Sequence, residues 1–376
     1  MTVFLGVKRV AGQRLPFRTQ VVNGLRDDDL SSQRSERLSA AMPDRPVDVL
    51  VIPDGAAQPP RAGVQTALEA AATPVLDELA AQGAVVRVAS TPTGLPAGSE
   101  TGIAALLGAA PRRVVGRGWV DAAAYGVEVP EGLTPWRADL LYRSGRRASI
   151  RQAREVCSHL GAGAHAVAGH RLLLVDRDRP TDRQLMGLHV RVWPGGAPAL
   201  GPLLVPTTLI CARSAAAGCG RLLGARVVVP AGATGDVDTN LHGKAAAALA
   251  ALTARDGDGG GGERIVVHFG APDEAAHRHD AGSVISALER MDAELLAPLR
   301  DAIHAAGGRL AVCPDHGTDP MTGLHDGAPV PAVLWGAGVV PRGPRKLSER
   351  AAAGAPVLAA EDLLPVAAGA AWSRGS

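Results

Sequence analysis

Aspartate and histidine residues recur at short spacings in the last third of this 376-residue chain. The stretch "DEAAHRHD" places Asp273 and His277 four residues apart, which puts both side chains on one face of a helix. "PDHGTD" places Asp315 beside His316, and His325 follows in "GLHDGAPVP". Each residue alone is typical of a helix cap, a solvated histidine or a turn. Together they predict a metal centre, because each follows an apolar segment or lies in a loop beyond one.

A further aspartate, Asp54, ends the apolar run in "VDVLVIPDG". Mixed carboxylate and imidazole ligands suit Mn²⁺ or Zn²⁺ better than Ca²⁺. With Asp54 the candidate ligands are too many for one tetrahedral ion and fit two ions with open positions. Two ions can hold both the attacking and the leaving oxygen of a phosphoryl displacement.

Ser99, in "PAGSETGIAALLG", has two interpretations. Serine is a common helix cap, and the apolar residues that follow are typical of a buried helix face. A serine at a helix amino end beside a metal centre is also a candidate nucleophile, because a hydroxyl needs such activation at neutral pH. The two roles do not exclude each other.

The elements that would position these residues alternate between strands and helices. Val47–Ile52 is a predicted buried strand, Pro74–Gln82 a helix, and "AVVRVA" another strand. "ERIVVHFG" and "RLAVC" are further strands, each followed by candidate ligands. This order predicts a doubly wound α/β sheet, in which sites form beyond the carboxyl ends of the strands.

The chain divides into four predicted parts. Residues 1–45 form a polar, poorly ordered extension, 46–126 and 231–376 form the two halves of the core, and 127–230 form an inserted α+β cap domain. The net charge of +2 and 3% aromatic content give no basic, aromatic-rich stripe, so nucleic acid is not an expected partner. No apolar run reaches 18 residues, so we expect a cytoplasmic protein without membrane contact.

The ordered motifs resemble those of the archaeal-type, cofactor-independent phosphoglycerate mutases of the alkaline phosphatase superfamily. The resemblance runs from about Val47 to Trp335 and includes "TPVLDELAAQG" (73–83), "GSETGIAALLG" (98–108), "GRGWVDAAAYGVEV" (116–129), "GATGDVDTNLHGKA" (232–245), "VHFGAPDEAAH" (267–277), "PDHGTDP" (314–320) and "LHDGAPVP" (324–331). It implies an alkaline-phosphatase-like sheet core with a cap domain, and phosphoryl transfer between hydroxyls of a small phosphorylated carboxylate.

The resemblance also implies roles for individual residues. Ser99 matches the serine that becomes phosphorylated, and Arg117 and Arg171 match arginines that bind the substrate's anionic groups. One metal ion would be held by Asp54, Ser99, Asp315 and His316, and the other by Asp273, His277 and His325. Two divalent ions are therefore the expected cofactors, with Mn²⁺ favoured over Mg²⁺, Co²⁺ and Zn²⁺. A homo-oligomer is compatible with the sequence.

The chain departs from the family pattern at Gly270, where the family has a lysine near substrate and serine. We therefore expect weak mutase activity on 3-phosphoglycerate, and a gain from Gly270→Lys. Three alternatives stay open: a repurposed transferase of phosphoryl or phosphonoyl groups, a phosphatase whose phosphoserine is released by water, and a binding protein without catalysis.

Overall fold

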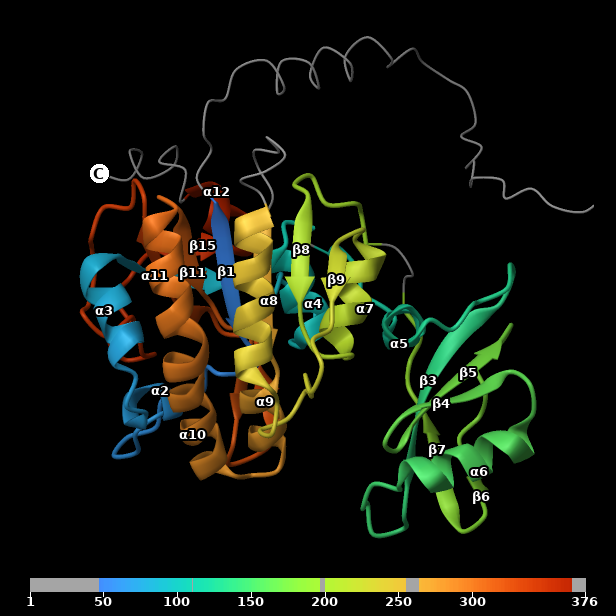
Figure 1. The fold of residues 1–376 in the computed structure, drawn as a ribbon. Helices are drawn as coiled ribbons and strands as arrows, with labels where there is room; N and C mark the ends of the chain where they lie inside the picture. The colour runs from blue at the N-terminus through green and yellow to red at the C-terminus, as the bar shows by residue number, and fades with distance from the viewer. Residues whose placement is uncertain (1–46, 110, 197–199, 255–263, 367–376) are drawn as a thin grey trace, which may run out of the picture. The chain divides into compact units, whose positions relative to one another are not determined.

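The structure, a computed structural model, describes residues 47–109, 111–196, 200–254 and 264–366. The predicted extension, 1–45, lies outside the described residues. Strands and helices alternate over most of the described chain, and Figure 1 shows their arrangement. None of the helices in these ranges is long and apolar enough to cross a bilayer.

The larger of the two main sheets has eight strands and carries the strand ends that matter for the site. Their order is β15 (Val357–Ala359), β2 (Ala84–Ala89), β14 (Val330–Gly336), β11 (Arg309–Val312), β1 (Asp48–Pro53), β10 (Arg264–Phe269), β8 (Thr207–Ile210) and β9 (Arg226–Val228). All pairings are parallel except those of β14, which is antiparallel to both neighbours. The predicted α/β sheet is confirmed, but its one reversed strand was not predicted.

The reversal of β14 follows from its connection to β11. The chain between these strands forms only a short hairpin, made of β12 (Gly317–Asp319) and β13 (Leu324–Asp326). A parallel neighbour would need a crossover that returns to the other end of the sheet, usually through a helix, whereas an antiparallel strand can begin at the end where β11 stops. This hairpin therefore lies at the sheet edge where β11 ends.

Helices cover both faces of the eight-stranded sheet, as a doubly wound fold requires. Val49 and Val51 of β1 pack into one layer, and the alternate residues Leu50 and Ile52 pack into the other. The first layer contains α2 (Ala67–Ala70), α3 (Pro74–Gln82), α8 (Leu241–Ala254), α9 (Ala271–His277), α10 (Ala281–Met291), the π-helical η1 (Asp292–Leu296) and α11 (Ala297–Ala305). The second contains α4 (Ser99–Leu106), α5 (Arg117–Tyr125), α7 (Ala215–Leu222), η2 (Ala360–Asp362) and α12 (Leu363–Val366).

A separate antiparallel sheet of five strands has its own core. Its order is β4 (Ala164–Ala168), β5 (Arg171–Asp176), β3 (Thr134–Leu141), β7 (Leu188–Val192) and β6 (Arg183–Leu185), with α6 (Ile150–Leu160) packed on it. The predicted insert, 127–230, is longer than this sheet, because β8 and β9 pair within the eight-stranded sheet. Apolar strands of the two sheets look alike in sequence, so the return to the first sheet could not be located there.

Candidate active site

Three neighbouring strands of the large sheet end beside one another. Pro53, the last residue of β1, pairs with Phe269 of β10, and Val51 pairs with Val312 of β11. This register places Asp54, the start of α9 and the Asp315–His316 segment at the same edge. The sequence-based prediction that these three strands deliver their side chains to one place is confirmed.

A glycine after β1 lets the strand end approach these carboxylates. Gly55 has φ +61°, and a Cβ atom there would lie 2.6 Å from Asp273 Oδ1 and 2.5 Å from Thr318 Oγ1. The Gly55 N–H donates to Asp315 Oδ1 over 3.1 Å, and the Thr318 hydroxyl donates to Asp273 Oδ1 over 2.6 Å. Any larger residue would therefore push away the candidate ligand Asp273 and Thr318, which donates to it.

Three histidines present the same nitrogen to this edge. Each has its Nδ1 within hydrogen-bond distance of a backbone carbonyl: His277 with Gly323 O (2.9 Å), His316 with Gly317 O (3.1 Å) and His325 with Ala97 O (3.1 Å). A carbonyl can only accept, so Nδ1 carries a proton, and whenever the ring is neutral its lone pair lies on Nε2. Histidines that bind metals are usually oriented in this way.

The same edge contains donor atoms whose protein contacts are in conflict or incomplete. The Nε2 atoms of His277 and His325 lie 2.9 Å apart and 3.3 and 3.5 Å from the Asp273 oxygens, so in neutral rings their lone pairs would face each other and a carboxylate. Asp315 Oδ2 is buried and has no hydrogen-bond partner among the described residues. Cations bound at these two places would remove both conflicts. The residues therefore fit divalent metal ions, and oxygen with imidazole nitrogen is a suitable donor set.

Within the described part of the chain, two groups of donor atoms are compact enough to hold an ion. Within each group the atoms lie within 4.8 Å of one another; one group is Asp273, His316 and His325, and the other is Asp54, His268 and Asp315. His316 was expected with Asp54, and its Nε2 does lie 3.3 Å from Asp54 Oδ1, so it faces both groups. The partition of ligands between two ions stays a prediction.

The carboxylates of the site are strongly perturbed by burial and by one another. Burial and the nearby charge of Asp54 raise the pKa of Asp315 well above its ordinary value. Burial also acts to raise the pKa of Asp273, but hydrogen bonds from His277 and His325 outweigh it and hold that pKa well below the ordinary value. Buried carboxylates in such a cluster need compensating positive charge.

Ser99 is the first residue of α4, and its hydroxyl points to the carboxylate cluster. The hydroxyl donates to Asp54 Oδ1 over 3.1 Å, and His316 Nε2 lies 3.5 Å away. Gly98 occupies the cap position, and the helix has no side-chain cap. The interpretation of Ser99 as a helix cap is therefore wrong. The hydroxyl instead lies at a helix amino end, where the backbone carries partial positive charge.

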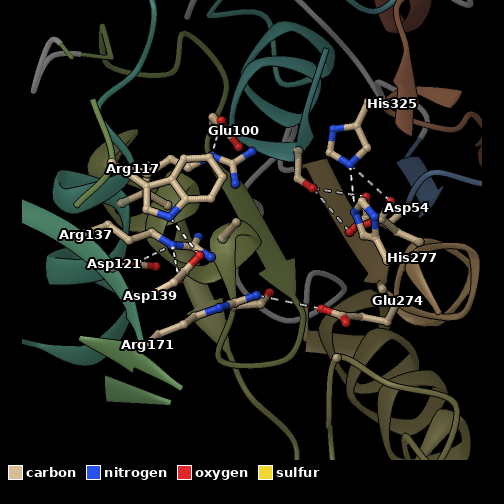
Figure 2. Close-up of a pocket in the computed structure, with 18 of the residues that line it drawn as sticks. Asp54, Glu100, Arg117, Asp121, Arg137, Asp139, Arg171, Glu274, His277 and His325 are labelled. Atoms are coloured by element: carbon tan, nitrogen blue, oxygen red, sulfur yellow. Dashed lines mark hydrogen bonds and ion pairs between the residues drawn. The ribbon is translucent and has the colours of Figure 1, made fainter. Parts of the chain in front are cut away.

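Arginines from α5 and the five-stranded sheet face these groups across a cavity of about 530 Å³, which contains both predicted anion-binding arginines. Arg117 donates from Nε to Glu100 Oε1 over 2.8 Å and lies over the Trp193 ring. Arg171 Nη2 lies 3.8 Å from Glu274 Oε1. Figure 2 shows the arginines on one side of the cavity and His277, His325 and Asp54 on the other.

Sequence reasoning missed other residues that line this cavity. Arg137, on β3, lies 3.4 Å from Asp139 and over Trp193; burial and the charge of Arg171 lower its pKa. His268, on β10, was also missed. A polar residue near the end of an otherwise apolar strand could have indicated His268, whereas the pairing of Arg137 depends on segments far apart in sequence.

Comparison with known proteins gives the family and several relatives of this chain. A sequence model of the metalloenzyme superfamily matches residues 47–360. The 2,3-bisphosphoglycerate-independent phosphoglycerate mutase 2 of Methanothermobacter thermautotrophicus is 28% identical over 77% of this chain and 89% of its own length. The 2,3-bisphosphoglycerate-independent phosphoglycerate mutase of Methanosarcina barkeri is 28% identical over 76% and 89%.

Two solved structures share the fold. A Pyrococcus horikoshii protein superposes with a TM-score of 0.70 at 23% identity, covering 87% of this chain and 97% of the other. A cofactor-independent phosphoglycerate mutase from Thermoplasma acidophilum superposes with a TM-score of 0.56 at 18% identity, covering 86% and 99%. The core sheet with a second, smaller sheet is thus an established architecture.

Proposed function

Because the chain belongs to the metalloenzyme superfamily, we propose that it is a two-metal phosphotransferase of the mutase type, which interconverts 3- and 2-phosphoglycerate or a close analogue. The observation that carries the proposal is the Ser99 hydroxyl, held 3.1 Å from Asp54 at the centre of a buried Asp/His cluster. The mutase names of relatives that align with three quarters of the chain support the same reaction.

Ser99 would carry the phosphoryl group between two hydroxyls. Its Oγ forms a bond to phosphorus as the bond from phosphorus to the substrate oxygen breaks, and the serine proton passes to that oxygen. The retained product then presents its other hydroxyl, whose oxygen bonds to phosphorus while the Ser99 bond breaks and the proton returns. The substrate must stay bound between the two steps, because water in the cavity would make the enzyme a phosphatase.

The remaining residues would bind and orient. Asp54 accepts the serine hydrogen bond and fixes the hydroxyl. Arg117 and Arg171, with Arg137 beside them, would bind the phosphate and carboxylate, for which guanidinium groups have a matching planar geometry.

Two divalent ions, with Mn²⁺ favoured, would be held by Asp54, Ser99, Asp315 and His316 and by Asp273, His277 and His325. When bound, they supply positive charge to the phosphoryl oxygens and lower the pKa of the serine hydroxyl.

A coupled assay tests the proposal. Purified full-length protein with Mn²⁺ is given 3-phosphoglycerate, and enolase reports any 2-phosphoglycerate. Mass spectrometry of the acid-quenched protein should find phosphate on Ser99. The matched control is Ser214→Ala, since Ser214 lines the same cavity but donates to its neighbour Ala212 O. Inactive protein with no phosphoserine, although it is folded and loaded with metal, would contradict the proposal.

A repurposed transferase is the second candidate, and Gly270 favours it. The resemblance expects a lysine here, but a Cβ atom on Gly270 would lie 2.8 Å from the backbone oxygen of Gly235. The Gly235 loop thus fills the space where the lysine side chain would begin. A different acceptor would need different groups near the serine. Rapid conversion of 3-phosphoglycerate by the unaltered protein would exclude this candidate.

The same contact changes the expectation for Gly270→Lys. The new side chain would have to displace the Gly235 backbone, so we now expect lower stability and no gain in mutase rate. Gly270→Ala is the control for size, because it introduces the same Cβ without the charge.

A further inference from the structure

His268 is a buried histidine near the end of the apolar strand β10, and one of its nitrogens is unsatisfied. Its relative exposure is 2%, and its Nε2 has no hydrogen-bond partner among the described residues. That nitrogen lies 3.3 Å from Asp54 Oδ2, without the geometry of a hydrogen bond. Burying an unsatisfied imidazole nitrogen is costly, so a binding partner that the protein itself does not supply is expected.

Asp315 has the same deficiency at the same place. Its Oδ2 is buried and without a hydrogen-bond partner, while its Oδ1 is satisfied by the Gly55 N–H. Donor atoms of Asp54, His268 and Asp315 lie within 4.8 Å of one another. One cation among them would satisfy the imidazole nitrogen and the carboxylate oxygen together, and two carboxylates match its double charge.

We infer that His268 is a ligand of the metal ion held by Asp54 and Asp315, an inference that rests on the two-ion centre proposed above. Neither the sequence motifs nor the resemblance gives His268 this role. It adds an imidazole to a site otherwise expected to contain Asp54, Ser99, Asp315 and His316. Added nitrogen would favour Mn²⁺, Co²⁺ or Zn²⁺ over Mg²⁺ in this position.

The backbone holds His268 in place for such a role. It pairs in register with Ile52 of β1, and its carbonyl accepts a hydrogen bond of 2.8 Å from the fully buried Lys244 Nζ. Side chains alternate along a strand, and Val266 packs in the layer that contains α4. His268 therefore points to the face of the sheet from which α4 presents Ser99.

A simple hydrogen bond from His268 to Asp54 is the competing explanation. It would leave Asp315 Oδ2 unsatisfied, and it requires the proton on Nε2, which would prevent that nitrogen from binding metal. The two explanations differ in whether the imidazole changes the electronic environment of a bound ion. A spectrum of the metal can therefore separate them where activity cannot.

The test uses the full-length protein, freed of metal and titrated with Co²⁺. Bound ions are counted by elemental analysis, and the visible absorption of Co²⁺ reports its ligands. We expect two ions in the unaltered protein. In His268→Asn, the affinity for one ion should fall by at least about 100-fold. Mutation of residues that only hydrogen-bond to metal ligands already lowers metal affinity by about 10–100-fold. The absorption bands of the Co²⁺ at this site should also shift. The matched control is His242→Asn, because His242 is highly exposed.

Proton NMR of the cobalt-loaded protein gives a measurement that needs no variant. Four histidine ligands should give four paramagnetically shifted imidazole N–H signals, whereas His277, His316 and His325 alone would give three. Two bound ions with three signals, or an unchanged cobalt spectrum and affinity in folded His268→Asn, would overturn the role of His268 alone. Failure of the unaltered protein to bind ions would instead overturn the two-ion centre.

Discussion

The two sides of the cavity differ in how their charges are balanced. On the Asp/His side, Asp315 Oδ2 has no partner, and the Nε2 atoms of His277 and His325 face each other at 2.9 Å. On the arginine side, three arginines are already paired with carboxylates: Arg117 with Glu100, Arg137 with Asp139 and Arg171 with Glu274. The Asp/His side therefore needs added metal ions, whereas the arginines must give up their carboxylate partners before they can bind an anionic substrate.

This difference indicates two kinds of preorganisation. The Asp/His side is built from the ends of paired strands, so its ligands stay in position and metal ions complete it. The Arg171–Glu274 pair, at 3.8 Å, is long enough for an anionic substrate to compete with it. Ion pairs that are partly exposed contribute only about 0–1 kcal/mol, so replacing this one costs little. The Arg137–Asp139 pair is largely buried and the Arg117–Glu100 pair is short, at 2.8 Å, so both are held more firmly.

The largest effect is expected from Ser99→Ala. Loss of a covalent nucleophile should lower kcat by at least about 10⁴-fold, as for other residues that act as one catalytic unit. The hydroxyl does not cap α4, so stability should change little. Steady-state kinetics and thermal unfolding measure the two effects, with Ser214→Ala as control. A folded, metal-loaded variant with near-normal kcat would show that Ser99 is not the nucleophile.

Metal removal should come next. Asp273→Asn keeps the shape of the side chain but removes its charge, so less metal should bind. The rate should fall by about 10³-fold, because metal ions contribute several kcal/mol to such reactions. A chelator should likewise lower the metal content and the rate of the unaltered protein, and added Mn²⁺ should restore both. Asp280→Asn is the control, because Asp280 caps α10 and asparagine caps equally well. Full activity in chelator, with no metal detected, would contradict the two-metal mechanism.

Arg171→Ala should affect the arginine side alone. Loss of a charge-assisted hydrogen bond of about 1.5–3 kcal/mol should raise KM by roughly 10–100-fold while metal content stays normal. Arg191→Ala is the matched control, since Arg191 is exposed on β7 of the same small sheet. Unchanged KM and kcat in Arg171→Ala would mean that this arginine does not contact substrate.

Metal affinity should also rise with pH. The hydrogen bond to Asp273 raises the pKa of His277, and burial raises the pKa of Asp315. Burial acts to lower the pKa of His316, but Asp315 and Asp54 outweigh it and raise that pKa to about 10. Ions must displace these protons, so affinity should gain about tenfold per pH unit for each proton released. Competition with a coloured chelator between pH 6 and 8.5 measures this. The arginines keep their charge in this range, so pH-independent affinity would contradict proton competition at the Asp/His side.

Sequence predicted the Asp/His side far better than the arginine side, for a physical reason. Asp54, Asp273 and Asp315 each follow an apolar strand, and neighbouring parallel strands end at one edge, so short local patterns suffice. The spacing of Asp273 and His277 predicted one helix face, and α9 confirms it with 3.3 Å between their polar atoms. His268 was missed because the apolar run that contains it is typical of any buried strand.

The arginine side depends on contacts between distant segments. Arg137 and Trp193 meet because β3 pairs with β7. Local sequence patterns do not determine the order of strands in the small sheet. The extent of the insert and the reversed β14 were missed for the same reason. Apolar alternation indicates a strand, but not its neighbours or its direction.

The smallest effect is expected from a substitution of Glu274, a residue that lies between the two sides of the cavity. This residue lies next to Asp273 on α9, and its carboxylate lies 3.8 Å from Arg171 and 3.9 Å from Arg147. Glu274→Gln removes the charge that competes with substrate for these arginines. KM should therefore fall by up to about fivefold, the equivalent of a partly exposed ion pair of at most about 1 kcal/mol.

A double-mutant cycle gives this prediction its control. If Glu274 acts by occupying Arg171, the effect of Glu274→Gln should shrink when Arg171 is already alanine, because the competing pair no longer exists. Metal content must stay unchanged, since Glu274 adjoins a candidate ligand. A higher KM in Glu274→Gln would show that the carboxylate positions the arginines for substrate and does not compete with it, and the two sides of the cavity would then both be built in advance.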